Sequence, residues 1–221
     1  MEGIADYDIL YLEQNVILRN LMEIDTGFYL TGGTCIHRFY LDYRYSDDLD
    51  FFCADNDLFR DYARDFLEFI KNKRFDFEYL VDTRDFIRIL FNRKLKIDFV
   101  NDRVFHYGKI EKSKEGYRID NIFNILANKI TAVISRDEPK DVFDICSISM
   151  NYDFRWKEII EIAKKKCYFE IDFLADRIQS FPIVLFDKIN AKSDIFIEKS
   201  KIRIGEIVKN ILNEEENKKV V

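Results

Sequence analysis

Apolar residues recur at two different spacings along the first half of the chain, which predicts helices and strands in alternation. A helical spacing marks residues 7–24, 34–42 and 57–73. Strand-like runs occupy residues 27–33, 48–53, 74–83, 85–92 and 94–102, and an edge strand is expected within 108–119. Because only short gaps separate the last three of the main runs, we expect antiparallel hairpins there.

The second half of the chain has helical spacing almost throughout. Asp120 or Asn121 is placed to cap a helix over 122–135, and Asp137 to cap the next one, with Pro139 in its first turn. Further helices are expected over 155–166, 170–181 and 200–216. The pattern predicts an α+β fold, in which residues 1–120 form a mixed sheet with flanking helices and residues 121–221 form a helical region.

Composition adds limits to this picture. Of the 221 residues, 48% are hydrophobic and only 2 are proline, so a large core is expected without a flexible linker. The acidic start of the chain has no basic export region, and no apolar run is long enough to cross a membrane, so we expect neither export nor insertion. Four scattered cysteines without a C-x-x-C pair are typical of a reducing cytoplasm. The net charge of −6 argues against a generally basic, nucleic-acid-coating surface.

Two acids, Asp48 and Asp50, stand one residue apart at the head of the run 48–53. Because side chains alternate across a strand, both project from one face, while Leu49 and Phe51 point toward the core. At about 5 Å separation and an effective dielectric near 20, two such charges repel by roughly 3 kcal/mol. Protonation of one acid or a bound divalent cation would relieve this repulsion, and carboxylate oxygens suit Mg²⁺ or Mn²⁺.

A third acid, Asp98, interrupts the apolar run 94–102. If this strand lies beside 48–53, three carboxylates converge as ligands for two metal ions, an arrangement suited to phosphoryl or nucleotidyl transfer. The adjacent Gly32 and Gly33, placed between a strand and a helix, suit a phosphate group. Taken separately, the acid pair is also consistent with an exposed strand edge and the glycine pair with an ordinary turn. Their combination and order favour a catalytic site.

The stretch 32–52 resembles the signature of the nucleotidyltransferase superfamily, most closely its AbiEii/AbiGii toxin branch. That branch typically has Gly-Gly-Thr-Ala-Leu followed by Arg-x-Ser-x-Asp-apolar-Asp-apolar, and this chain supplies Gly32, Gly33, Thr34, Arg44, Ser46, Asp48 and Asp50. The branch then has a Lys-x-x-Ala-(x)₃-Arg helix and an Arg-Asp-x-x-Asp segment, matched by Lys129, Ala132, Arg136, Asp141 and Asp144. The resemblance covers about residues 28–149. Cys35 and Lys140 depart from it, since they replace the usual Ala and Arg.

The resemblance implies roles for these residues. The implied catalytic set is Asp48, Asp50, Asp98, Lys129 and Asp141, of which Asp48, Asp50 and Asp98 would hold Mg²⁺ or Mn²⁺. The implied nucleotide-binding set is Gly32, Gly33, Thr34, Arg44, Ser46 and Lys129, although Arg44 would alternatively pin the loop. Asp141 and Asp144 share a helix face and would orient Lys129 or the acceptor. The alternative for these two acids is ordinary surface pairing with Arg136 or Lys140.

The expected activity is metal-dependent transfer of a nucleoside monophosphate from an NTP to an acceptor hydroxyl. The resemblance implies the toxin of a toxin–antitoxin pair in the cytoplasm, with tRNA as the candidate acceptor and a cognate antitoxin as partner. Two alternatives are a nucleotidyltransferase that modifies a small molecule or protein, and a non-catalytic nucleotide-binding or interaction module. The intact set of three acids argues against the second. His37 and His106 are expected to be structural, since neither has an identifiable catalytic partner.

Overall fold

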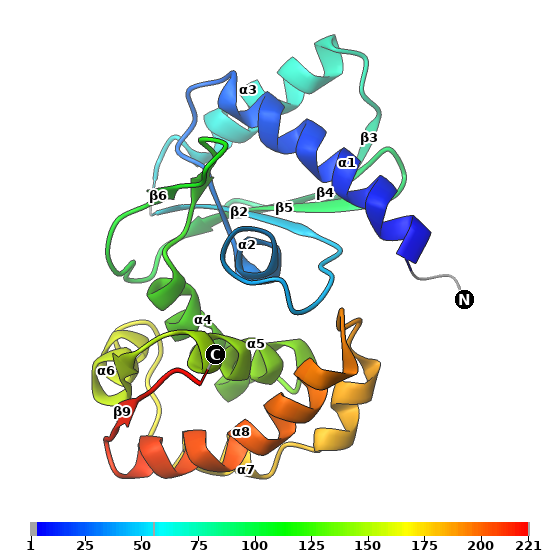
Figure 1. Cartoon of the computed structure of the whole chain (residues 1–221). Coiled ribbons are helices and arrows are strands. Elements are labelled where there is room, and N and C mark those ends of the chain that lie inside the picture. Colours follow the sequence, from blue (N-terminus) through cyan, green and yellow to red (C-terminus); the bar gives the residue numbers. More distant parts are fainter. Residues whose placement is uncertain (1–3, 55, 221) are drawn as a thin grey trace. The chain divides into compact units, whose positions relative to one another are not determined.

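The computed structural model describes residues 4–54 and 56–220 and contains a mixed sheet of seven strands, in the order β3-β4-β5-β2-β1-β7-β6 (Figure 1). The first three residues of the N-terminal stretch considered above for export lie outside the described residues. The strands are β1 (Tyr29–Thr31), β2 (Leu49–Ala54), β3 (Phe77–Asp82), β4 (Phe86–Phe91), β5 (Leu95–Asp102), β6 (Glu111–Lys112) and β7 (Arg118–Ile119). Strands β3, β4 and β5 form the predicted antiparallel hairpins, whereas β5 lies parallel to β2.

Helices α1 (Ile4–Met22) and α3 (Phe59–Asn72) cover one face of this sheet (Figure 1). The core forms there, because alternate residues of β2 and β5 point toward the helices. Phe99 of β5 lies 5.7 Å, between ring centroids, from both Phe51 of β2 and Phe66 of α3. The alternation that buries these rings leaves the intervening residues of β2 and β5 on the other face.

The chain divides into two compact units. The sheet unit comprises the residues up to Cys35 together with Ser46–Val104 and Lys109–Asp120. The helical unit comprises Ile36–Tyr45, Phe105–Gly108 and the residues from Asn121 onward. Its elements are the π-helical turn η1 (Ile36–Tyr40), α4 (Ile122–Ser135), α5 (Pro139–Asn151), β8 (Phe154–Arg155), α6 (Trp156–Lys164), α7 (Ile171–Gln179), the 3₁₀ turn η2 (Ile183–Lys188), α8 (Asp194–Leu212) and β9 (Glu216–Asn217). Within the described residues, no helix is long and apolar enough to cross a membrane.

The mixed sheet with flanking helices confirms the predicted fold class, but several element ends differ. Asn121 caps α4 as expected, its side chain accepting from the backbone N–H of Asn124 at 2.9 Å. The cap expected at Asp137 is wrong, because Glu138 occupies that position directly before Pro139. Helix α8 begins six residues before the predicted start at 200, after Ser193, whose hydroxyl accepts from the N–H of Ile195.

Two local conformations were not predicted. The single helix expected over 34–42 divides into α2 (Gly32–Cys35) and the wider η1 turn. The C-terminal region, expected to be wholly helical, also contains the short antiparallel pair β8–β9. A two-residue strand has no periodicity of its own, so only pairing between distant segments reveals it.

Candidate functional site

A row of polar side chains crosses the face of the sheet opposite to α1 and α3. Arg88 of β4 is the register partner of Asp98 in β5, Asp98 is the partner of Asp50 in β2, and Asp50 is the partner of Thr31 in β1. Register partners project from the same face of a sheet. The carboxylates of Asp50 and Asp98 are therefore neighbours, as the strand pattern predicted if β2 and β5 lie side by side.

Two cationic side chains from the same strands neutralise this acidic face. The Arg88 guanidinium donates from Nε and Nη2 to the two carboxylate oxygens of Asp98, each at 2.7 Å. The Lys96 Nζ lies 2.6 Å from Oδ2 of Asp48. These pairs offset the repulsion expected between the acids. Arg88 was not among the predicted site residues, although a single charged residue within the apolar strand β4 was the available signal.

Gly32 brings backbone directly against Asp50. Its φ of +71° lies in the left-handed region, and a Cβ there would stand 2.5 Å from Oδ2 of Asp50. Any side chain at this position would both strain the backbone and displace that carboxylate. The position therefore needs glycine for two independent physical reasons.

Hydrogen bonds of Thr34 in α2 and of Ser46 hold the segment that leads into β2. Their hydroxyl oxygens lie 2.8 Å apart, and the Thr34 hydroxyl also donates to the carbonyl oxygen of Asp48. The Ser46 backbone is held from α1, where the Gln14 amide donates to its carbonyl at 3.0 Å and the Tyr11 hydroxyl accepts from its N–H at 3.1 Å. These contacts fix the segment that carries Asp48. That Thr34 and Ser46 contact nucleotide stays a prediction.

The donor chemistry of this face suits a hard divalent cation, because carboxylate oxygens project from adjacent strands beside the backbone of Gly32. As arranged in residues 4–54 and 56–220, however, no three acidic, histidine or cysteine side chains are gathered as ligands of one ion. Arg88 instead occupies both oxygens of Asp98. The role of Asp48, Asp50 and Asp98 as metal ligands stays a prediction; Arg88 and Lys96 pair with Asp98 and Asp48.

The helical unit contains a second cluster of charged side chains, almost entirely buried. Lys129 of α4 places its Nζ 2.8 Å from Asp141 and 2.7 Å from Asp144, both on α5. Arg44 donates from Nε and Nη2 to the two oxygens of Asp144, each at 2.8 Å. His37 of η1 completes the cluster, with its Nε2 2.8 Å from Oδ1 of Asp144. Asp144 thus pairs with Lys129, Arg44 and His37, which come from three separate segments of the chain.

The electrostatics of this cluster follow from burial and proximity. Burial by itself would raise the pKa of Asp144, but attraction to Arg44 and Lys129 holds it well below its usual range. The pKa of Asp141 is likewise lowered, because Lys129 and Arg136 outweigh its burial. Burial lowers the pKa of His37, despite its hydrogen bond to Asp144. The cluster is therefore built from two carboxylates held in the ionised form and a neutral imidazole.

These contacts decide between the alternatives that the sequence left open for the two acids. Asp141 and Asp144 do not lie on the surface, because both residues are buried, at 1% and 0% exposure. Arg136 does contact Asp141, at 2.6 Å, but the carboxylate itself is inside the protein. Arg44 is 2% exposed and holds Asp144, which is the pinning alternative for this residue; its contact with nucleotide stays a prediction.

A comparison with known protein families shows to which family the chain belongs. A family model described as "Nucleotidyl transferase AbiEii toxin, Type IV TA system" matches residues 17–203. The chain belongs to this AbiEii family. It is accordingly a nucleotidyltransferase of a toxin family, which confirms the resemblance seen in the sequence. The residues that resemble the family signature in the sequence lie in both clusters described above.

Individual relatives are more distant. The chain is 29% identical over 173 residues to an uncharacterized protein of Aquifex aeolicus (strain VF5), covering 73% of this chain and 77% of that one. Its fold is similar to the crystal structure of JHP933 from Helicobacter pylori, with a TM-score of 0.58 and 21% identity, over 96% of this chain and 93% of that one. MenT4, a nucleotidyltransferase toxin of Mycobacterium tuberculosis, matches with a TM-score of 0.48 and 14% identity over 84% of this chain and 68% of that one.

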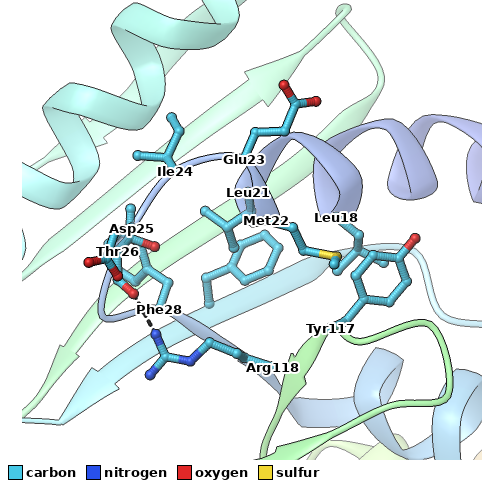
Figure 2. A pocket seen from close by; sticks show the side chains of 11 residues that line it. Leu18, Leu21, Met22, Glu23, Ile24, Asp25, Thr26, Phe28, Tyr117 and Arg118 are labelled. Atoms are coloured by element: carbon cyan, nitrogen blue, oxygen red, sulfur yellow. Dashed lines mark hydrogen bonds between the residues drawn. The ribbon is translucent and has the colours of Figure 1, made fainter.

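A pocket in this AbiEii-family chain lies away from the acidic face. It has a volume of about 280 Å³ and is lined by Leu18, Leu21, Met22, Glu23, Ile24, Asp25, Thr26, Phe28, Phe51, Tyr117 and Arg118 (Figure 2). Phe51 points to the helix-covered side of β2, whereas its neighbour Asp50 points to the other side. Figure 2 shows the Arg118 guanidinium directed at the Thr26 carbonyl, to which it donates. The pocket is thus separate from the carboxylates of β2 and β5.

Proposed function

We propose that this toxin-family nucleotidyltransferase moves a nucleoside monophosphate from an NTP to a hydroxyl group of tRNA, in a reaction that depends on Mg²⁺ or Mn²⁺. The observation that carries the proposal is the register pairing of Asp50 with Asp98, beside a glycine whose backbone lies against Asp50. Carboxylates from adjacent strands beside open backbone suit the binding of a metal–triphosphate complex.

In this reaction the acceptor oxygen bonds to the α-phosphorus, the bond from that phosphorus to the bridging oxygen breaks, and pyrophosphate leaves. The acceptor hydroxyl loses its proton to solvent. A divalent cation supplies Lewis acidity, which lowers the pKa of the acceptor hydroxyl and offsets the phosphate charge. Asp48, Asp50 and Asp98 would hold that cation.

The remaining predicted residues supply position rather than reactive atoms. Gly32 and Gly33 leave backbone accessible to phosphate oxygens, since neither carries a side chain. Thr34 and Ser46 hold the segment before β2, so that Asp48 keeps its place. Lys129 and Asp141 are proposed as a coupled pair whose charges organise the family's second motif.

The test is transfer of label to RNA. Purified protein is incubated with Mg²⁺, total RNA or purified tRNA, and each NTP labelled in turn at the α- or γ-phosphate. We expect the α-label, but not the γ-label, to appear in the tRNA band, and EDTA to abolish it. Asp50→Asn should lower the amount of α-label in the tRNA band by at least about a thousandfold. Asp65→Asn, a change at an exposed acid of α3 with 54% side-chain exposure, is the matched control and should leave it unchanged.

Each outcome has a distinct meaning. No labelled RNA with any NTP rejects RNA as the acceptor, and label on a protein or small molecule would favour the alternative acceptors instead. Undiminished labelling by Asp50→Asn rejects the assignment of the acids. Labelling that persists in EDTA rejects metal dependence.

We further propose a cognate antitoxin and a cytoplasmic site of action, where NTP and tRNA are present. The family description, which names a toxin–antitoxin system, supports the partner. Expression of the chain in bacteria should slow growth, and co-expression of a neighbouring antitoxin-like gene should restore it. Unimpaired growth during expression of active protein would contradict the toxin role.

A further inference from the structure

Asp98 differs from Asp48 in how firmly its charge is compensated. The Asp98 side chain is 9% exposed and receives two guanidinium hydrogen bonds, whereas the Asp48 side chain is 36% exposed and contacts a single ammonium. Two parallel hydrogen bonds from Arg to a carboxylate are among the strongest charge-assisted contacts in proteins. A cation would therefore have more difficulty reaching Asp98 than Asp48.

Arg88 can release this carboxylate without disturbing the core. Its side chain is 35% exposed and belongs to the less buried face of β4, where the guanidinium carbon lies 5.2 Å from the centroid of the Phe86 ring. Its charge is also attracted by Asp48 and Asp50, so it acts on the whole acidic face. A divalent cation on Asp98 would stand within a few ångströms of this positive charge, and like charges at that distance repel strongly.

We propose that Arg88 competes with the divalent cation for Asp98, and that it exchanges this carboxylate for the triphosphate when metal and nucleotide bind together. The inference rests on the proposed function, because it assigns Arg88 a place in the same site. The exchange keeps every charge paired: the cation takes Asp98, and the guanidinium takes phosphate oxygens, which match its planar fork as well as a carboxylate does. In the free enzyme the guanidinium thereby compensates the charge of Asp98.

The first test measures binding of Mn²⁺ alone, by electron paramagnetic resonance of the free ion, to the whole folded chain. We expect Arg88→Gln to bind Mn²⁺ at least about tenfold more tightly than wild type, because removing the guanidinium frees a carboxylate ligand. Arg88→Gln combined with Asp98→Asn should lose that gain. Arg103→Gln is the matched control, because Arg103 forms an equally short pair, 2.7 Å from Asp85, in the same unit. It should bind Mn²⁺ like wild type.

The second test measures NTP binding in the presence of saturating Mn²⁺. Here the expected change in affinity is in the opposite direction. Arg88→Gln should bind NTP about tenfold more weakly than wild type, since the triphosphate loses a bidentate partner. A folded Arg88→Gln protein whose Mn²⁺ affinity equals or falls below that of wild type would overturn the proposal. If Arg88→Gln does not fold, Arg88→Lys, which retains the charge but not the fork, should give an intermediate Mn²⁺ affinity, and a wild-type value would overturn it.

Failure of this inference is distinguishable from failure of the proposed function. Wild-type labelling of tRNA together with an unchanged Mn²⁺ affinity in Arg88→Gln rejects the exchange alone. The predicted Mn²⁺ gain without any labelled RNA supports the competition and rejects the acceptor.

Discussion

Asp50 of β2 and Asp98 of β5 are direct register partners in a parallel pair of strands, with their carboxylates on the same face. Parallel pairing in this register brings together two acids that are remote in the sequence. Because the opposite faces of both strands bury apolar side chains, among them Phe51 and Phe99, a shift by one residue would exchange acids for core side chains. The core therefore fixes the geometry of the acidic face.

This pairing predicts stabilisation by ligand. Mn²⁺ with NTP at about one hundred times the dissociation constant should add about 2.7 kcal/mol to the free energy of unfolding, which raises the Tm by several degrees. Asp50→Asn should abolish the rise, whereas Asp65→Asn should retain it. Thermal unfolding followed by circular dichroism measures both. An equal rise in Asp50→Asn would show that ligand binds elsewhere.

Gly32→Ala should disable the site without dismantling the fold. The added Cβ meets Oδ2 of Asp50 at 2.5 Å and requires a left-handed backbone, at a cost of about 1–2 kcal/mol for the backbone alone. We expect a lower Tm and loss of nucleotide transfer. Gly205→Ala in α8, where no atom lies within 4 Å of the new Cβ, should instead stabilise by about 0.5–1 kcal/mol. Equal effects of the two changes would contradict the close approach at Gly32.

Asp144→Asn should be strongly destabilising. The change leaves Arg44 and Lys129 buried with less negative charge to compensate them, and breaking such a buried pair costs about 3–5 kcal/mol. Urea denaturation measures the loss. Asp61→Asn removes an exposed partner of Arg64 and should leave stability unchanged within error. A small effect at Asp144 would mean that the cluster is not a structural unit.

His37 predicts a pH dependence of stability. Its folded-state pKa is lowered by burial, so the unfolded chain takes up a proton near the ordinary value of about 6.5 while the folded chain does not. Stability should therefore fall as the pH drops below about 6.5, by up to about 1.4 kcal/mol per pH unit. The acids with lowered pKa lose their contribution only at lower pH, so the interval from pH 7 to pH 5 reports on His37.

His37→Gln, which keeps a donor toward Asp144, should flatten this dependence. Urea denaturation of wild type and variant at pH 8, 6 and 5 measures it, and His106→Gln controls for the loss of any histidine. Parallel curves for His37→Gln and wild type would show that another group titrates in this interval.

Local pattern in the sequence was sufficient for much of the fold. Alternation in β2 and β5 predicted that Asp48 and Asp50 share a face and that Asp98 interrupts an apolar strand, because the two-residue period of a strand is a local property. Helical spacing predicted α1, α3 and α4 in the same way. The match of Gly32 and the acid pair to the family signature also needed only neighbouring residues.

Tertiary structure decided what lies beside each of these groups. The parallel placement of β5 against β2, the guanidinium of Arg88 on Asp98, and the meeting of His37 and Arg44 at Asp144 all join segments that no local period connects. Such contacts depend on strand order and on the burial of charge, which emerge only when the whole core packs. The sequence therefore determined which side chains share a face of one helix or strand. Packing of the core determined which charged side chains from other elements pair with them.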